Sequence, residues 1–280
     1  MLDIKITGGR VADGLCDRAY RADVGIAGDK IVEIGDLRDV PARKTIDAEG
    51  KVVAPGFIDM HTHSDMSLLY DRRASSKIRD GVTTEVIGNC GIGVAPVCEA
   101  RKSQLITYLG TRLIGTIPVR LELPWNTMGE YLAALEKAPA AANVAPLLAQ
   151  GAVRINEMGF SSAHPTPEQM ARMKAEVAKA LDEGCFGLSS GLVYMPGEYS
   201  TEDELAALCA VMAPNGRFYV THMRSESDDL FAALEEAIAT AQKGGVPLHI
   251  SHLKLAGAGV KGQTERLFAR LEKAKAEGLD

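Results

Sequence analysis

The chain has 280 residues, of which 46% are hydrophobic and 24% charged, and its net charge is −6 at pH 7 with a pI near 5.6. This length allows a large buried core in one or two domains. The acidic balance, without any run of five or more basic residues, argues against nucleic acid or an acidic lipid surface as a partner.

The beginning of the chain lacks the features of a secretory signal. Residues 1–9 alternate in polarity and carry charge from Asp3 onward, so they have no apolar segment. No apolar run reaches the length of about eighteen residues that a membrane span requires. The five cysteines are scattered and do not have the spacing of a zinc finger. We therefore expect a cytoplasmic protein with reduced thiols and no membrane partner.

Residues 1–53 consist of short alternating runs separated by turns. Strands are predicted over 2–6, 23–26, 31–35 and 45–48, with glycine and acidic residues between them. This pattern predicts a small β-sandwich module whose core would be marginal on its own.

Residues 54–280 follow a different pattern, in which apolar runs alternate with helical stretches. Such alternation is typical of βα units and a parallel sheet. The predicted strands cover 52–58, 81–87, 144–148, 185–189, 217–221 and 246–251, with helices in much of the sequence between and after them. Thr166 and Thr201 each precede a glutamine or glutamate by three residues, which predicts a capping box at both helix starts. The predicted fold is an α/β chain of the (β/α)8 TIM type, truncated after about six βα units.

Five potential metal ligands follow these strands. His61 and His63 lie two residues apart at the end of the first strand, so both side chains point to the same side. Cys90, His222 and His252 lie at or just beyond the ends of three other strands. In a (β/α)8 barrel these ends form the active face. The pattern predicts a metal site, in which Cys90 either bridges two ions or completes one set with His222 and His252.

Three further side chains are candidates for contacts with a substrate. Arg224 and Lys254 either bind a carboxylate or pair with Glu226 or Asp228. Tyr194 lies in a loop bounded by glycine and proline, where it either donates to a substrate oxygen or packs.

These motifs resemble those of a known family. The sequence PGFIDMHTH at 55–63, with the β module before it and His222 and His252 after it, is similar to the amidohydrolase superfamily. More narrowly, the chain resembles the D-aminoacylases, or N-acyl-D-amino-acid deacylases, in three segments: GVTTEVIGNCG at 81–91, SSGLVY at 189–194 and THMRSE at 221–226. In that group a cysteine, matched here by Cys90, stands where many relatives use a carboxylated lysine.

The resemblance implies a zinc-dependent hydrolase. One zinc ion would be held tightly by Cys90, His222 and His252, and the resemblance leaves open a second, weaker ion at His61 and His63 that shares Cys90.

The implied substrate is a small N-acyl-D-amino acid, hydrolysed to a carboxylate and a free D-amino acid. Tyr194 would polarise the scissile carbonyl, and Lys254 and Arg224 would lie near the substrate carboxylate.

The sequence departs from the family pattern in three places. The family's general acid and base is an aspartate after strand eight, which we expect beyond residue 280, since no residue of this chain matches it. Asp280 is not that residue. The family's β module is completed by segments after the barrel. Gln150, at the end of the third predicted strand, stands where relatives carry a histidine.

Two alternatives remain open. A cyclic-amide hydrolase of the dihydropyrimidinase type shares the fold, although Cys90 in place of a lysine argues against it. The other alternative is a catalytically incomplete, metal-binding fragment, whose open sheet edges favour self-association. If the chain is active as it stands, Asp65 or Glu226 would have to transfer the proton.

Overall fold

The computed structural model describes residues 1–113, 121–137 and 139–280. By their internal contacts they form two units, residues 1–57 and residues 58–280. Residues 114–120 and 138 lie outside the described residues, and they belong to the segment 101–138 between the second and third predicted strands, for which the sequence predicts mostly helix.

The first unit consists of short strands in two sheets, as the alternating sequence predicts. One sheet has the order β5-β4-β1-β6 and the other β3-β2-β7. β1 pairs antiparallel with β4 and parallel with β6. The strands are β1 (Leu2–Thr7), β2 (Arg10–Val11), β3 (Tyr20–Arg21), β4 (Asp23–Ala27), β5 (Lys30–Gly35), β6 (Ala42–Asp47) and β7 (Val52–Val53).

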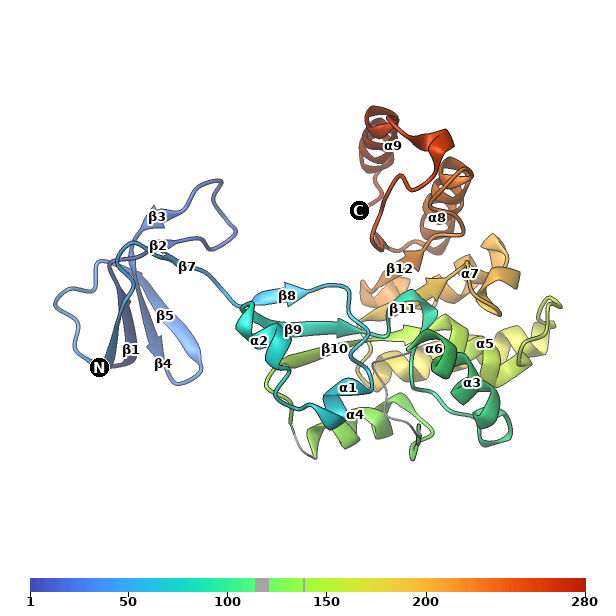
Figure 1. Cartoon of the computed structure of the whole chain (residues 1–280), viewed down its shortest axis with the longest axis horizontal. Coiled ribbons are helices and arrows are strands. Elements are labelled where there is room, and N and C mark those ends of the chain that lie inside the picture. The colour runs from blue at the N-terminus through green and yellow to red at the C-terminus, as the bar shows by residue number, and fades with distance from the viewer. Residues whose placement is uncertain (114–120, 138) are drawn as a thin grey trace. The chain divides into compact units, whose positions relative to one another are not determined.

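The second unit is built on a six-stranded sheet whose strands follow chain order, β8-β9-β10-β11-β12-β13 (Figure 1). Neighbouring strands from β9 to β13 pair in parallel. For example, Val220 of β12 is in register with Ser189 of β11 on one side and with His249 of β13 on the other. The strands are β8 (Phe57–Asp59), β9 (Val82–Ile87), β10 (Asn143–Ala149), β11 (Gly187–Gly191), β12 (Phe218–His222) and β13 (Leu248–Ile250). The sheet curls as part of a (β/α)8 barrel does, which confirms the predicted fold class.

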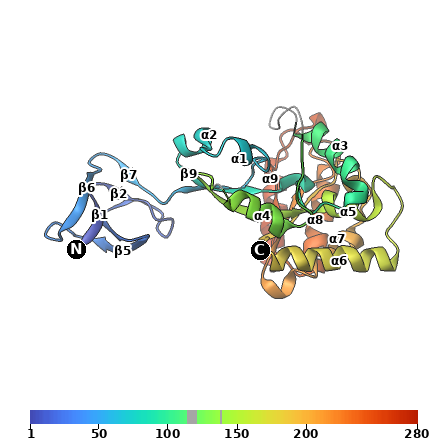
Figure 2. The ribbon, with the colours of Figure 1, turned by 90° about the horizontal axis from the view of Figure 1, so that it is seen from below.

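Helices alternate with these strands and cover the outer side of the sheet (Figures 1 and 2). The α-helices are α1 (Ser67–Tyr70), α2 (Ser75–Arg79), α3 (Lys102–Arg112), α4 (Met128–Glu136), α5 (Gln150–Met158), α6 (Pro167–Asp182), α7 (Glu202–Cys209), α8 (Leu230–Gly244) and α9 (Thr264–Ala276). Short 3-10 helices are η1 (Asn89–Gly91), η2 (Glu99–Arg101), η3 (Gly197–Tyr199), η4 (Ala213–Asn215) and η5 (Ala258–Val260). Within the described ranges, no helix combines the length and apolar character needed to cross a membrane.

The main core lies between the sheet and its helices. Leu148, Leu188 and Tyr219 from the strands pack in one cluster with Val177 of α6 and Leu208 of α7. A much smaller cluster contains the buried residues Val86, Leu147 and Val220. These three residues come from three strands of the sheet, β9, β10 and β12.

The prediction of one buried strand over 52–58 was wrong. The segment forms two strands in different sheets, β7 and β8, and Pro55, which has no backbone N–H to donate, lies between them. Val52 and Ile58 are 61% and 59% exposed. β8 is an edge strand of its sheet, so its side chains lack the cover that the apolar sequence suggested.

Of the two predicted capping boxes, one is complete. Thr166 accepts a hydrogen bond from the Gln169 amide, and the Gln169 side chain accepts one from the Thr166 amide. Thr201 likewise accepts from the Glu204 amide at 3.2 Å, but the Glu204 carboxylate is not part of the box. It binds the buried guanidinium of Arg154 instead, because an uncompensated buried charge costs more than an unmade cap.

Candidate metal centre

The carboxyl ends of four strands bring the five predicted ligands together. His61 and His63 follow β8, Cys90 lies in η1 after β9, His222 ends β12, and His252 follows β13. The ligand atoms of His61, His63 and Cys90 all lie within 4.8 Å of one another, as do those of Cys90, His222 and His252.

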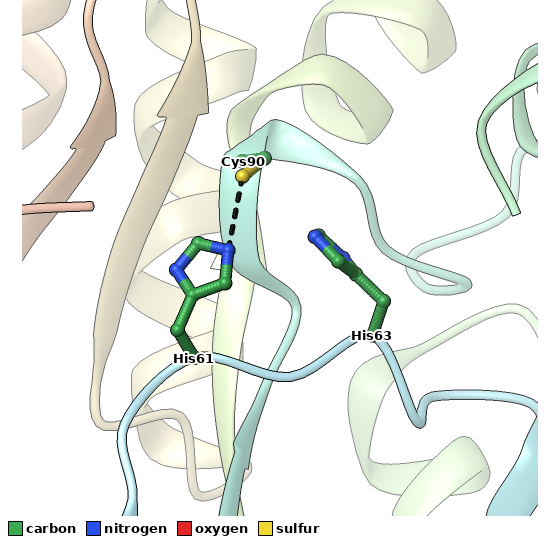
Figure 3. Close-up of side chains that lie close together, drawn as sticks. All are labelled: His61, His63 and Cys90. Carbon is green, nitrogen blue, oxygen red and sulfur yellow. Dashed lines mark hydrogen bonds between the residues drawn. The ribbon is translucent and has the colours of Figure 1, made fainter. Parts of the chain in front are cut away.

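Cys90 is the shared member of these two groups. Its Sγ lies 3.3 Å from Nε2 of His61 and 3.5 Å from Nε2 of His252. Figure 3 shows the rings of His61 and His63 reaching toward the sulfur from one loop, and their ring centroids are 5.2 Å apart. The rings of His222 and His252 are 4.4 Å apart. One thiol thus lies between two pairs of imidazoles.

The backbone that holds Cys90 depends on a close approach to a neighbouring strand. Cys90 has a left-handed backbone with φ 56°, as does Gly88, two residues earlier, with φ 78°. At Gly191, at the end of β11, an added Cβ would lie 2.0 Å from the Cys90 carbonyl oxygen. Only glycine at position 191 leaves room for this turn.

Burial favours the neutral form of three of the four histidines, His61, His63 and His222. Burial, reinforced by the neighbouring imidazoles, lowers the pKa of His61 and that of His222 to about 4. Burial and His252 also lower the pKa of His63. Neutral imidazole nitrogens have the free lone pair that a metal ion requires.

The thiol and the unpaired ring nitrogens indicate that this group of side chains fits a metal ion. Burial, reinforced by the negative charge of Glu226, raises the pKa of Cys90 to about 12, so a nearby cation would be needed to keep the thiolate at neutral pH. The Nδ1 atoms of His61, His63 and His222 are buried without a hydrogen-bond partner in the described part of the chain. One sulfur and four imidazoles form a donor set that suits zinc.

Glu226 orients His252 from the outer side. Its Oε1 lies 2.6 Å from Nδ1 of His252, and its Oε2 lies 2.5 Å from Nζ of Lys254. Burial opposes ionisation of Glu226, but the hydrogen bonds from Lys254 and His252 outweigh it and lower its pKa. A carboxylate on the second ring nitrogen is the usual support for a metal-binding histidine. The sequence did not single out this role, because Glu226 is one of several acids near Lys254.

Tyr194 and Arg224 have different surroundings. The Tyr194 ring lies 5.1 Å from the His222 ring, so the phenol is next to the ligand group. Arg224 pairs with Glu236 at 2.8 Å and donates to the carbonyl oxygens of Glu198 and Ser200 at 2.6 and 2.9 Å. Neither Glu226 nor Asp228 is its partner in these contacts. The guanidinium therefore holds the loop that follows Tyr194.

Two buried acids lie beside the first pair of histidines, of which the sequence pointed to Asp65 as a candidate for proton transfer but not to Glu85. Glu85 is 1% exposed and is hydrogen-bonded by the hydroxyls of Ser64 and Thr62. Asp65 is 2% exposed, and burial raises its pKa to about 7. The available signal for Glu85 was its charge inside a strand whose other residues are all uncharged.

Gln150 begins α5 instead of ending a strand, and it is fully buried. Its Nε2 donates to Oγ of Ser200 at 2.8 Å, and Ser200 in turn donates to Glu204. Gln150 is thus part of the support for the loop at residues 197–200.

Comparisons with known proteins agree with this geometry. The model of the amidohydrolase family matches residues 44–277. The chain is 37% identical over 274 residues to a D-aminoacylase of Alcaligenes xylosoxydans xylosoxydans, covering 98% of this chain and 55% of the relative.

Two solved structures each align with the whole chain and 57% of their own chain. One, of D-aminoacylase, concerns the functional role of its binuclear metal centre, with 35% identity and a TM-score of 0.89. The other is N-acyl-D-glutamate deacylase from Bordetella bronchiseptica, complexed with zinc and a phosphonate inhibitor, with 34% identity and a TM-score of 0.87. An L-hydantoinase from Arthrobacter aurescens, at 20% identity and a TM-score of 0.62, shares the fold alone.

The chain spans about half the length of the curated relatives it matches. Its similarity to the D-aminoacylases nevertheless extends over nearly all of its own residues, and the family model covers most of them. The chain therefore belongs to the amidohydrolase family.

Proposed function

We propose that this chain forms the zinc centre of an N-acyl-D-amino-acid deacylase, which hydrolyses the amide bond to a carboxylate and a D-amino acid. The observation that carries the proposal is the position of Cys90 Sγ, within 3.5 Å of histidine nitrogens from both pairs. The names of the similar D-aminoacylase and N-acyl-D-glutamate deacylase support the substrate class.

The two histidine pairs differ in how firmly they are held. His252, in the second pair, is fixed by the Glu226 carboxylate, whereas Nδ1 of His61, of His63 and of His222 has no hydrogen-bond partner among the residues described. Cys90, His222 and His252 would therefore hold the tight zinc, and His61 and His63 would provide a weaker second site that shares Cys90. When bound, zinc lowers the pKa of a coordinated water and polarises a carbonyl.

The remaining side chains would bind and orient the substrate. Burial, reinforced by Cys90, raises the pKa of Tyr194, so its phenol keeps its proton and can donate to the scissile carbonyl oxygen. Lys254 is the cation next to His252 and would attract the substrate α-carboxylate.

Two predicted roles remain predictions. One is direct substrate contact by Arg224, whose present contacts favour support of the loop. The other is a general acid and base beyond residue 280. Both carboxylate oxygens of Glu226 are already bonded to His252 and Lys254, so Glu226 positions His252 and is poorly placed to move a proton.

The compartment and partners also remain proposals. The free cysteines of the structure and the acidic pI of about 5.6 support a reducing, cytoplasmic setting and a small-molecule partner in place of nucleic acid. Ile58 and Met60, 59% and 38% exposed near the edge strand β8, support self-association through that edge.

The direct test combines metal content with substrate selectivity. The purified chain is loaded with zinc, its metal is measured by mass spectrometry, and hydrolysis is followed with N-acetyl-D-methionine, its L enantiomer and hydantoin. We expect bound zinc, and we expect any hydrolysis to be confined to the D compound. Hydrolysis of hydantoin would favour the cyclic-amide alternative. Bound zinc without hydrolysis of any compound would support the incomplete fragment.

A further inference from the structure

Most cations around the candidate centre are neutralised by acids of this chain. Lys254 pairs with Glu226 at 2.5 Å, and Arg224 pairs with Glu236 at 2.8 Å. The buried Arg154 is likewise paired with Glu204. Each of these cations thus already has an acidic partner in this chain.

Arg112, the last residue of α3, differs from them. Its guanidinium carbon lies 4.5 Å from the centroid of the Tyr194 ring and 5.8 Å from that of Tyr108. Both rings belong to the surroundings of the candidate centre. Tyr194 is next to His222, and the Tyr108 hydroxyl donates at 3.1 Å to the carbonyl oxygen of Gly91, the residue after Cys90.

The charge of Arg112 has no acidic partner within this chain. Among the described residues, no carboxylate lies within ion-pair distance of its guanidinium, and its Nε is buried without a hydrogen-bond partner. The segments outside the described residues, 114–120 and 138, contain no aspartate or glutamate. A partly buried cation without an anion is costly, so this position favours an anion that comes from a ligand.

We propose that Arg112 binds the side-chain carboxylate of an acidic N-acyl-D-amino acid and is the residue that selects such substrates. This inference rests on the proposed function. Lys254 would bind the α-carboxylate, which leaves a second carboxylate for Arg112. The contact of the Arg112 guanidinium carbon with the Tyr194 ring does not use the N–H groups, so they stay available for a two-point bond to a carboxylate.

The preference for an acidic side chain can be measured with two nearly isosteric ligands. N-acetyl-D-glutamate and N-acetyl-D-glutamine differ in side-chain charge and hardly in size, so only the former would compensate Arg112. Calorimetry on the zinc-loaded chain gives both dissociation constants where the ligands are not turned over, and the ratio of the two KM values replaces them where they are. We expect the glutamate compound to bind about tenfold to a hundredfold more tightly.

Three variants separate this role from packing. Arg112→Met keeps the bulk over Tyr194 and should reduce the preference to about twofold or less, and Arg112→Lys should retain part of it. Arg266→Met is the matched control, because Arg266 also covers an aromatic ring, that of Phe231, away from the centre. It should leave the preference unchanged. Circular dichroism checks that all three variants are folded.

The outcomes distinguish this inference from the proposed function. If the two compounds bind equally to the parent chain, or if Arg112→Met weakens both by the same factor, the inference is wrong and the deacylase proposal stands. If neither these compounds nor N-acetyl-D-methionine binds, both are wrong.

Discussion

The Sγ of Cys90 lies 3.5 Å from Nε2 of His252, although the two residues are 162 positions apart in the sequence. Both have a left-handed backbone, with φ 56° and 37°, and Ala74 is the only other non-glycine residue with positive φ in the described ranges. Such conformations cost about 1–3 kcal/mol each and persist where the surrounding structure enforces them. The strained backbone thus coincides with the proposed ligands, as expected of a functional site.

Removal of the shared sulfur should abolish both metal sites. In Cys90→Ala the two histidine pairs lose their common ligand, so we expect the chain to lose its zinc during gel filtration in metal-free buffer. Metal analysis of the eluted protein measures the loss. Cys209→Ala, which removes a buried thiol outside the centre, is the matched control and should retain zinc at the parent level. Equal zinc in both variants would show that Cys90 is not a ligand.

Neutralising the carboxylate behind His252 should weaken the tight site without removing it. In Glu226→Gln the amide can still hydrogen-bond Nδ1 of His252 but no longer stabilises the ring electrostatically. Loss of such a supporting group lowers metal affinity by about 10- to 100-fold. Competition with a chromophoric chelator gives the affinity. Glu235→Gln is the control, because the Glu235 side chain is 56% exposed and pairs with Arg270 instead of a candidate ligand. A change of similar size in both variants would contradict the role of Glu226.

The parts of this molecule that could be predicted from sequence are those with a periodic or local signal. Apolar runs ending in histidine or cysteine gave the strands and the ligands, since parallel strands place their carboxyl ends at one edge. Edge effects could not be predicted, because the exposure of Ile58 depends on which strands lie beside β8.

Long-range charge pairing was equally hidden from the sequence. Glu204 fits a capping box by spacing, and only the fold shows that Arg154, fifty residues earlier, takes its carboxylate. Arg112 has no sequence signal at all, because an arginine at the end of a helix is usually solvated. Its significance comes from the two tyrosine rings that it covers.

Buried thiols should make the fold sensitive to alkali. Burial raises the pKa of Cys185 and of Cys209 to about 12 from the ordinary value of 9.0. The two thiols contribute fully to the free energy of unfolding below pH 9. This contribution is lost as the pH rises from 9 toward 12, because in that range the thiols lose their protons in the unfolded chain but keep them in the folded one. At pH 10.5 each thiol should lower the free energy of unfolding by about 1–2 kcal/mol.

Urea titrations at pH 8 and pH 10.5 measure this loss. Cys209→Ala should show a smaller drop between the two pH values than the parent chain. Cys16→Ala, which removes an exposed thiol, should show the parental drop. If both variants behave alike, burial of the thiol does not govern the alkaline response.

The buried pair of Arg154 and Glu204 should be the most sensitive ionic contact of the second unit. The side chains are 0% and 2% exposed, with Nη1 of Arg154 2.6 Å from a Glu204 oxygen. In Glu204→Gln the guanidinium stays buried with no anionic partner, which costs about 3–5 kcal/mol of unfolding free energy. Urea denaturation measures it.

Glu157→Gln is the matched control, because Glu157 pairs with Arg172, whose side chain is 61% exposed. Its cost should stay below about 1 kcal/mol. The double variant Arg154→Met with Glu204→Leu removes both charges and should recover much of the lost stability, because neither charge is then buried alone. If Glu204→Gln costs no more than Glu157→Gln, the buried pair is not what holds α5 to α7. If only the double variant is strongly destabilised, the packing of the methylene groups matters more than the charge.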